Sequence, residues 1–283
     1  MMAAIGYKRE DKYGFQSNER NTMSWKMTLL SGMMVYCSFS TLTFATEQNT
    51  LRIGVNSGYA PFEVKTNDGK LSGLDIDIGN EVCKRLNVRC QWIELNFDSL
   101  IPALQAKKID VINSAMNITE KRKQAIAFTA PIYVVPIQMV AKKDSALQPN
   151  AASLKGKRLG VQQGTSQEDY AKKYWATAGV NIISYPEQNE VFMDLAAGRL
   201  DAALQETQTA QDDFLKQPQG ADFTFVGQPL KDDETLGKGT GFGLRKSDTT
   251  LTKQVDQTLT GMKVDGTLRQ LSMKYFQQDI TAQ

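Results

Sequence analysis

Residues 113–122, NSAMNITEKR, place an arginine where a helix is expected to begin. Thr119 is a typical N-cap residue, so Arg122 falls in the first turn of that helix. A cation at this position opposes the helix dipole, at a cost of roughly 0.3–1 kcal/mol. Arg122 is therefore either a tolerated, solvated side chain or a group that binds an anion, since a guanidinium matches a carboxylate in bidentate geometry.

A second group of donors lies in residues 162–169, QQGTSQED. We expect a strand to end here, Gly164 to turn the chain, and a helix to open at Thr165 or Ser166. The free N–H groups at such a helix start can bind an anion. Ordinary capping by Thr165 or Ser166 is the plainer interpretation. Together, this segment and Arg122 could hold one carboxylate between them.

Glu206, Tyr59 and Phe97 are candidates for the rest of a binding site. Glu206 follows the apolar segment LDAALQ, where its carboxylate could meet an ammonium group; the alternative is an exposed loop residue. Tyr59 and Phe97 each follow a predicted strand. Their ring faces could hold a ligand side chain or its cation, and the alternative for each is a place in the hydrophobic core.

The elements that would position these residues occur twice along the chain. LRIGVNSGY at 51–59 is similar to KRLGVQQGT at 157–165, and ALQAKKIDVI at 103–112 is similar to DLAAGRLDAAL at 194–204. Two similar pairs in the same order indicate two lobes that are built alike. Strands alternate with helices around them, which predicts an α/β fold with mostly parallel sheets. Ligands of such sheets bind beyond the carboxyl ends of the strands, and those ends can face each other across a cleft.

Two segments are suited to connect the lobes. PIYVVPIQMVAKK at 131–143 is apolar with a central proline, and GTGFGLRK at 239–246 is rich in glycine. Two crossings predict a hinge. We therefore predict one lobe from 46–134 together with 240–283, and a second lobe from 135–239. The C-terminal helices should pack back on the first lobe.

Composition excludes several classes of function. The chain has 283 residues, 41% of them hydrophobic and 23% charged, and its formal net charge is +2. Nothing in these values suggests a surface for nucleic acid or membrane. The chain has no histidine, which removes histidine-based triads, the usual zinc sites and a histidine general base. We expect no cofactor, no metal and a monomer.

The N-terminal segment has the order of a secretory signal. From Met23 the chain runs through Lys26 and an apolar stretch to small residues that end at Ala45. This order predicts a cleaved signal peptide over 23–45 and a location in the periplasm. A membrane anchor is the alternative, but the apolar run is interrupted by serines and is short for a span. Residues 1–22 are polar and without pattern, which indicates an upstream extension that is not native.

Two cysteines, Cys83 and Cys90, remain after the predicted cleavage. An even number of cysteines in an exported protein predicts a disulfide between them. Two free buried thiols are the alternative.

Residues 51–283 closely resemble the periplasmic lysine/arginine/ornithine-binding and histidine-binding proteins, which are bacterial solute-binding proteins of family 3. The motifs that match are GYAPFE, GLDIDIGNEVCKR, FDSLIPALQAKKID, ITEKR, SLKGKRLGV, QGTSQE, AGRLDAALQ and GTGFGLRK. The resemblance implies a two-lobed type II periplasmic-binding fold with a two-strand hinge. It also implies a receptor that delivers a free amino acid to the permease and ATPase of an ABC importer.

The resemblance implies a ligand-binding set as well. Arg122 would bind the α-carboxylate, helped by Ser114 and the backbone near Ser166. Tyr59 and Phe97 would flank the side chain, and Asp75 would lie near its cationic end. Gln167 would line the second lobe. The full predicted set is Asn56, Tyr59, Asp75, Phe97, Ser114, Ala115, Asn117, Arg122, Gln162, Ser166, Gln167 and Glu206.

Four positions depart from the pattern of the basic-amino-acid receptors. Asn56 stands where they have an aspartate near the side-chain pocket, and Ala115 and Asn117 stand where they have serines. Glu206 stands where they have the aspartate that binds the α-ammonium. We predict a basic amino acid (arginine, lysine, ornithine or histidine) as the ligand. An opine or another N-substituted amino acid is the alternative, because Ala115 leaves room near the α-amino group.

A secreted dehydratase on the same fold is the alternative of another class. Glu206 is the one cleft carboxylate that could act as a general acid in such an enzyme. The sequence shows charged candidates for a cleft but no paired nucleophile and base, so we predict binding without catalysis.

Overall fold

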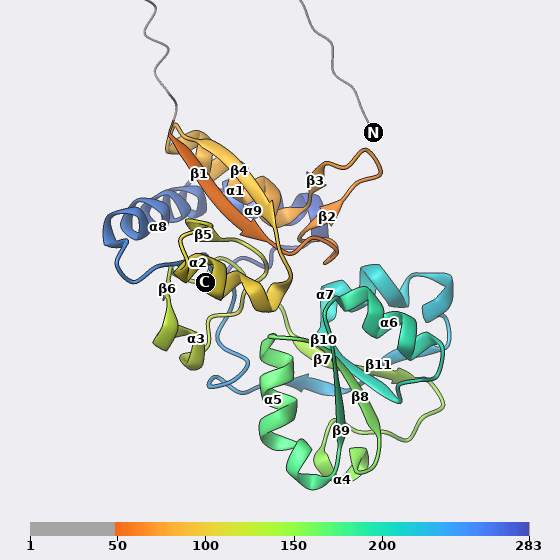
Figure 1. Cartoon of the computed structure of the whole chain (residues 1–283). Coiled ribbons are helices and arrows are strands. Elements are labelled where there is room, and N and C mark those ends of the chain that lie inside the picture. Colours follow the sequence, from red (N-terminus) through yellow and green to blue (C-terminus); the bar gives the residue numbers. More distant parts are fainter. Residues whose placement is uncertain (1–48, 283) are drawn as a thin grey trace, which may run out of the picture. The chain divides into compact units, whose positions relative to one another are not determined.

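The computed structural model describes residues 49–282. The predicted signal peptide and the upstream extension lie outside the described residues. The described chain contains two five-stranded sheets, which belong to two lobes (Figure 1). Within residues 49–282, no helix combines the length and the apolar character needed to cross a membrane.

The sheet of the first lobe has the strand order β4-β1-β5-β12-β6. β1 pairs in parallel with β4 and β5, whereas β12 runs antiparallel to β5 and β6. Its strands are β1 (Thr50–Val55), β4 (Arg89–Glu94), β5 (Val111–Ile112), β6 (Ala127–Phe128) and β12 (Gly243–Leu244). The helices of this lobe are α1 (Leu74–Arg85), η1 (Phe97–Ser99), α2 (Leu100–Gln105), α3 (Glu120–Ala125), α8 (Thr249–Val264) and α9 (Thr267–Phe276). A small hairpin of β2 (Val64–Lys65) and β3 (Leu71–Ser72) precedes α1.

The sheet of the second lobe has the order β11-β7-β10-β8-β9. β8 pairs in parallel with β9 and β10, and β7 runs antiparallel to β10 and β11. Its strands are β7 (Ile137–Lys142), β8 (Arg158–Gln162), β9 (Asn181–Tyr185), β10 (Ala202–Glu206) and β11 (Phe223–Leu230). Its helices are α4 (Ala151–Leu154), α5 (Ser166–Tyr174), η2 (Ala176–Ala178), α6 (Gln188–Ala196), α7 (Thr207–Thr209), the π-helical η3 (Ala210–Leu215) and η4 (Pro218–Gly220).

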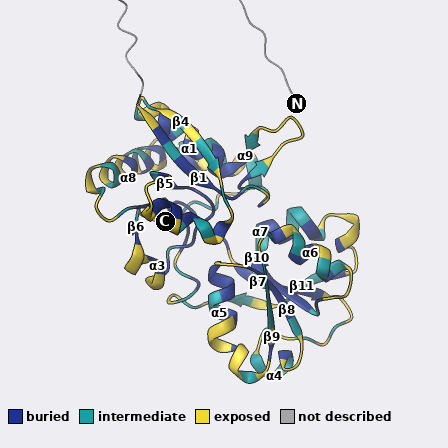
Figure 2. Cartoon of the chain, in the orientation of Figure 1, coloured by how far each residue is buried: buried dark blue, intermediate teal, exposed yellow. Residues whose placement is uncertain are grey.

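Hydrophobic clusters cover both faces of each sheet, because successive strand residues point to opposite faces. In β1, Ile53 belongs to the cluster of α1, α8 and α9, which confirms that the C-terminal helices pack on the first lobe. A second cluster with α2 covers the other face. In the second lobe, Leu204 packs toward α5 and Ala203 packs toward α6. Figure 2 shows the central strands buried in both lobes.

The chain passes between the two sheets twice, after Phe128 and after Leu230. The two connecting segments lie side by side, since the Thr240 N–H donates to the Tyr133 carbonyl at 2.9 Å and the Ile132 N–H donates to the Thr240 carbonyl at 2.8 Å. The strands of each sheet come from the parts of the chain assigned to that lobe from the sequence. The bounds of 135–239 for the second lobe stay a prediction.

The internal similarity extends to individual side chains. Arg52 in β1 forms an ion pair with Asp110 at 2.7 Å, and Arg158 in β8 forms one with Asp201 at 3.0 Å. In both pairs the backbone N–H of the arginine also donates to the aspartate. The two lobes therefore repeat one local structure, in which the aspartate before one central strand is tied to the arginine at the start of its neighbour.

The strand glycines repeat as well. An added Cβ at Gly54 would lie 2.3 Å from Ile109 Cδ1, and one at Gly160 would lie 2.3 Å from Leu200 Cδ1. Ile109 and Leu200 each precede the aspartate of the repeated ion pair. Glycine at these positions lets an apolar side chain lie directly against the strand.

The predicted disulfide joins Cys83 and Cys90. It connects the last turn of α1 to the beginning of β4 in the first lobe.

Candidate ligand-binding site

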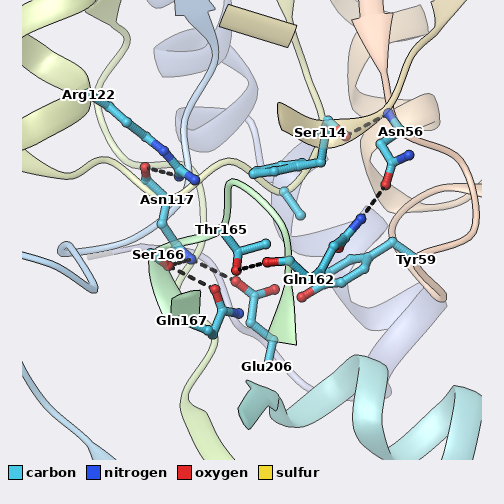
Figure 3. Close-up of a pocket in the computed structure, with 12 residues that line it drawn as sticks. Asn56, Tyr59, Ser114, Asn117, Arg122, Gln162, Thr165, Ser166, Gln167 and Glu206 are labelled. Carbon is cyan, nitrogen blue, oxygen red and sulfur yellow. Dashed lines mark hydrogen bonds between the residues drawn. The ribbon is translucent and has the colours of Figure 1, made fainter. Parts of the chain in front are cut away.

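The pocket between the lobes is nearly filled by side chains: its cavity volume is about 10 Å³, far below the roughly 300–1,000 Å³ usual for small-molecule sites. Figure 3 shows the side chains that line it, which come from both lobes. They are Asn56, Tyr59, Phe97, Ser114, Ala115, Asn117, Arg122, Gln162, Thr165, Ser166, Gln167 and Glu206. Every predicted ligand-binding residue except Asp75 is in this group, and Thr165 is an addition.

Arg122 is a buried cation that forms no ion pair with any residue of 49–282. The Thr119 hydroxyl accepts from the Arg122 N–H at 3.2 Å, as the predicted cap requires. Arg122 Nη1 donates to the Asn117 carbonyl at 2.8 Å and Nη2 to the Gly164 carbonyl at 3.0 Å. Burial lowers the pKa of the guanidinium to about 10, so it stays charged at neutral pH. In the described part of the chain, no carboxylate lies within ion-pair distance of Arg122, whereas its neighbour Lys121 pairs with Asp169.

The start of α5 faces the pocket from the second lobe. The Thr165 hydroxyl accepts from the Glu168 N–H at 3.2 Å, so the capping interpretation holds for Thr165. The Glu168 carboxylate in turn accepts from the Gly164 N–H at 2.7 Å. The N–H groups of Ser166 and Gln167 are in the first turn of α5 and have no partner within the helix. They remain available to an anion.

Gly164 makes this arrangement possible. Its φ of +77° is left-handed, and an added Cβ would lie 2.8 Å from the Cα of Asp98 in the first lobe. Only glycine adopts this conformation without strain and leaves room for the opposite lobe.

Glu206, the last residue of β10, is a buried carboxylate with one free oxygen. It is 1% exposed, which excludes the alternative of an exposed loop residue. Its Oε1 accepts from Asn117 Nδ2 at 2.8 Å, and its Oε2 has no partner in the described structure (Figure 3). Burial raises the pKa of Glu206 to about 7, against the lowering effects of Asn117, Tyr59 and Arg122. The carboxyl therefore titrates near neutral pH.

Tyr59 and Phe97 are buried and also line the pocket. The Tyr59 hydroxyl donates to Gln205 Oε1 in the second lobe at 2.8 Å. The Arg122 guanidinium lies 5.3 Å from the centre of the Phe97 ring, within the range of a cation–π contact. The two rings thus belong to the core and to the pocket wall at once.

Asn56 lies at the far side of the pocket from Arg122 (Figure 3). Its Oδ1 accepts from Gln162 Nε2 at 2.9 Å, and its Nδ2 donates to the Leu95 carbonyl at 3.2 Å and to Glu187 Oε2 at 3.1 Å. Glu187 did not emerge from the sequence. It precedes α6 and belongs to no motif that relates it to residue 56, so only the folded chain brings the two together.

Asp75 lies behind the pocket wall, in α1. Its carboxylate accepts from the Ala115 N–H at 2.7 Å and from the Tyr133 hydroxyl at 2.8 Å. Burial raises the pKa of Asp75, and burial together with the charge of Asp75 holds the pKa of nearby Glu63 well above its usual value. Asp75 holds the backbone of Ala115, which has a left-handed φ of 42°. Its predicted contact with a ligand stays a prediction.

The pocket therefore combines a buried guanidinium with a buried carboxylate that has a free oxygen. Each group costs free energy when it is left unpaired away from water. A small ligand that carries both a carboxylate and an ammonium would pair both groups. The arrangement is suited to holding such a ligand by noncovalent contacts.

Similarity to known proteins confirms the family that was predicted from the sequence. The family model "Bacterial extracellular solute-binding proteins, family 3" matches residues 51–278. The histidine-binding periplasmic protein of Salmonella typhimurium is 46% identical over 255 residues, which is 90% of this chain and 98% of that protein. The lysine/arginine/ornithine-binding periplasmic protein of Escherichia coli is 47% identical over 251 residues, or 89% of this chain and 96% of that protein.

Solved structures show the same fold. An ancestral arginine-binding protein bound to arginine has a TM-score of 0.75 and 34% identity, covering 81% of this chain and 99% of that one. The same kind of protein bound to glutamine has a TM-score of 0.74 and 34% identity, covering 82% and 99%. The predicted two-lobed periplasmic-binding fold is confirmed.

Proposed function

Because the chain belongs to the bacterial extracellular solute-binding proteins of family 3, we propose that it captures a free amino acid in the periplasm. In this proposal it then delivers the ligand to the permease and ATPase of an ABC importer. The histidine-binding and lysine/arginine/ornithine-binding relatives favour a basic amino acid as the ligand. The chain acts as a receptor, with no catalytic step.

The observation that supports this proposal most strongly is the pair of complementary buried charges in one pocket. Arg122 binds the α-carboxylate, together with Ser114 and the N–H groups at the start of α5. Glu206 binds the α-ammonium through its free Oε2. The two groups come from different lobes, so one amino acid joins the lobes through both of its charges.

The lobes must part for a ligand to enter. Several hydrogen bonds of pocket residues cross between the lobes, among them Tyr59 to Gln205 at 2.8 Å, Asn117 to Glu206 at 2.8 Å, Gln162 to Asn56 at 2.9 Å, and Arg122 to the Gly164 carbonyl at 3.0 Å. The two adjacent connecting segments are the proposed hinge. Small-angle scattering should show a smaller radius of gyration with ligand than without, and an unchanged radius at saturating ligand would argue for a rigid site.

Calorimetric titration with arginine, lysine, ornithine, histidine and glutamine tests the ligand class. Arginine derivatives test the two charge contacts: agmatine lacks the α-carboxylate, and argininic acid has a hydroxyl in place of the α-ammonium. Each should bind roughly tenfold to hundredfold more weakly than arginine, since a charged hydrogen bond contributes about 1.5–3 kcal/mol. Binding of agmatine as tight as that of arginine would refute the role of Arg122, and tightest binding of glutamine would refute the basic class.

An N-substituted amino acid is the second candidate ligand. Ala115 lines the pocket with a single methyl group, and Glu206 reaches into it from the opposite lobe. Octopine, an arginine derivative substituted at the α-nitrogen, belongs in the same titration series. Tighter binding of octopine than of arginine would favour the opine alternative.

A further inference from the structure

Hydrogen-bond acceptors lie directly behind Asn56 and Gln162, which line one end of the pocket. The Leu95 carbonyl and the Glu187 carboxylate surround the Asn56 amide, and the Pro186 carbonyl lies 3.3 Å from Gln162 Nε2. In the described contacts at this end, the donors are the side-chain amides of Asn56 and Gln162. A guanidinium or an ammonium has only donors. Such a group fits this end of the pocket better than a second acceptor would.

Glu187 is the carboxylate that contacts the Asn56 amide at this end. Its two oxygens lie 3.4 and 3.1 Å from Asn56 Nδ2. Among the ion pairs that the described residues form in the second lobe, none includes Glu187; Glu168, Asp194 and Glu234, by contrast, each pair with a lysine or arginine. The carboxylate is half-buried and is met by a neutral amide instead of a cation.

The surroundings of Glu187 disfavour its charge in the absence of a cation. Burial raises the pKa of Glu187, the nearby carboxylates of Glu190 and Asp98 raise it further, and the hydrogen bond from Asn56 opposes this. A positively charged group beside Glu187 would offset both unfavourable effects.

We propose that Glu187 recognises the positive charge at the end of the ligand's side chain. This inference rests on the proposed function, since it names the residue that selects a basic amino acid over a neutral one. Arg122 and Glu206 hold the α-carboxylate and the α-ammonium, and the side chain extends between Tyr59 and Phe97 toward Asn56. There its cation takes the place of the Asn56 amide as the partner of Glu187.

The position of Glu187 has a consequence for selectivity. Asn56 follows β1 in the first lobe, whereas Glu187 precedes α6 in the second. Glu187 therefore reaches the side-chain end only when the lobes are together. The protein therefore selects a positively charged side chain when the lobes close, because the first lobe by itself does not carry the Glu187 carboxylate.

Arginine and citrulline provide the probe, because citrulline has nearly the same shape with a neutral urea in place of the guanidinium. Calorimetry would give the dissociation constants of both for the wild type, Glu187→Gln and Glu234→Gln. Glu234→Gln is the matched control, since it makes the same change on the same lobe at an exposed residue paired with Lys173. Glu187→Gln should weaken arginine about tenfold and change citrulline by less than about threefold, while the control leaves both within about twofold.

A double variant separates charge recognition from a structural role of Glu187 at the start of α6. Asn56→Asp with Glu187→Gln moves the carboxylate from the second lobe to the first and should recover at least part of the preference for arginine. An equal loss for arginine and citrulline in Glu187→Gln, no loss for either, or no recovery in the double variant would overturn the inference. If the wild type binds neither arginine nor any other amino acid, the proposed function itself fails.

Discussion

The two lobes repeat one scaffold but bring opposite charges to the pocket. Arg52–Asp110 in the first lobe and Arg158–Asp201 in the second tie the central strands together in the same way. The first lobe then contributes the Arg122 guanidinium, and the second contributes the Glu206 carboxylate. The repeated scaffold therefore fixes the positions of the pocket side chains. The residue types at the ends of its strands and helices fix the charges that the pocket offers.

The difference between the lobes explains why a two-lobed receptor suits a zwitterion. Neither lobe offers both the buried guanidinium and the buried carboxylate that line the pocket. A ligand held by one lobe alone satisfies one charge and leaves the other in water. In the proposed binding mode both charges would be paired only across the two lobes, so the free energy of binding would favour the joined arrangement.

Removing the charge of the first lobe should have the largest effect. Arg122→Ala leaves the ligand's carboxylate desolvated and unpaired, with an expected loss of about 3–5 kcal/mol in binding. Calorimetry measures this loss. Lys123→Ala is the control, since Lys123 is on the same helix and pairs with Glu120 at the surface. A loss below about tenfold would reject Arg122 as the main contact of the α-carboxylate.

Removing the disulfide should affect the two lobes unequally, because Cys83–Cys90 lies in the first lobe. The chain-entropy estimate for a loop of this size is about 2.5 kcal/mol of stability. In the variant Cys83→Ser/Cys90→Ser, hydrogen exchange should become faster in α1 and β4 and stay unchanged in β8 and α5. Equal acceleration in both lobes would show that they unfold as one cooperative unit.

The paired glycines compare the two lobes directly. Gly54→Ala and Gly160→Ala each force a methyl group against an apolar side chain, at a cost of about 1–3 kcal/mol. The second neighbour is Leu100 Cδ2 at 3.1 Å for Gly54 and Val191 Cγ1 at 2.8 Å for Gly160. Gly160→Ala should therefore cost more, because the branched Val191 is closer and less able to move. Urea unfolding measures both, and the reverse order would contradict this account.

The pH dependence of binding should come from the second lobe. An ammonium pairs with ionised Glu206, whose pKa is raised by burial to about 7. Affinity should therefore be full above pH 8 and about tenfold weaker at pH 6, because one proton must be released on binding. Glu206→Gln should bind more weakly at pH 8 and lose this dependence. A pH dependence that survives in the variant would place the titrating group elsewhere.

Glu206 should give the stability of the folded protein a pH dependence opposite to that of ligand binding. Between pH 4.5 and about pH 7, the folded protein holds a proton on Glu206 that the unfolded chain has released. The contribution of Glu206 to the stability of the ligand-free protein therefore falls as pH rises through this range. The difference in melting temperature between wild type and Glu206→Gln should follow this trend, and a difference that does not vary with pH would contradict it.

Features that depend on neighbouring residues could be predicted from the amino-acid order. The three-residue spacing from Thr119 to Arg122 places the arginine in the first turn of α3, because an N-cap side chain accepts from an N–H two or three residues further on. The repeated motifs predicted the two lobes for a similar reason, since each motif is one strand with its turn. Arg122, Glu206, Tyr59 and Phe97 could be predicted because they follow such local elements directly, whereas most of the remaining pocket residues were predicted only from the resemblance to known receptors.

Contacts between side chains that are distant in the sequence depend on how the whole chain folds. Asn117 and Glu206 are 89 residues apart and Asn56 and Glu187 are 131 apart, and no local pattern relates the members of either pair. The sequence likewise did not show that the Asp75 carboxylate accepts from the Ala115 N–H and the Tyr133 hydroxyl, which are 40 and 58 residues away. A buried carboxylate costs free energy unless it accepts hydrogen bonds, and the donors that it finds are supplied by other parts of the chain.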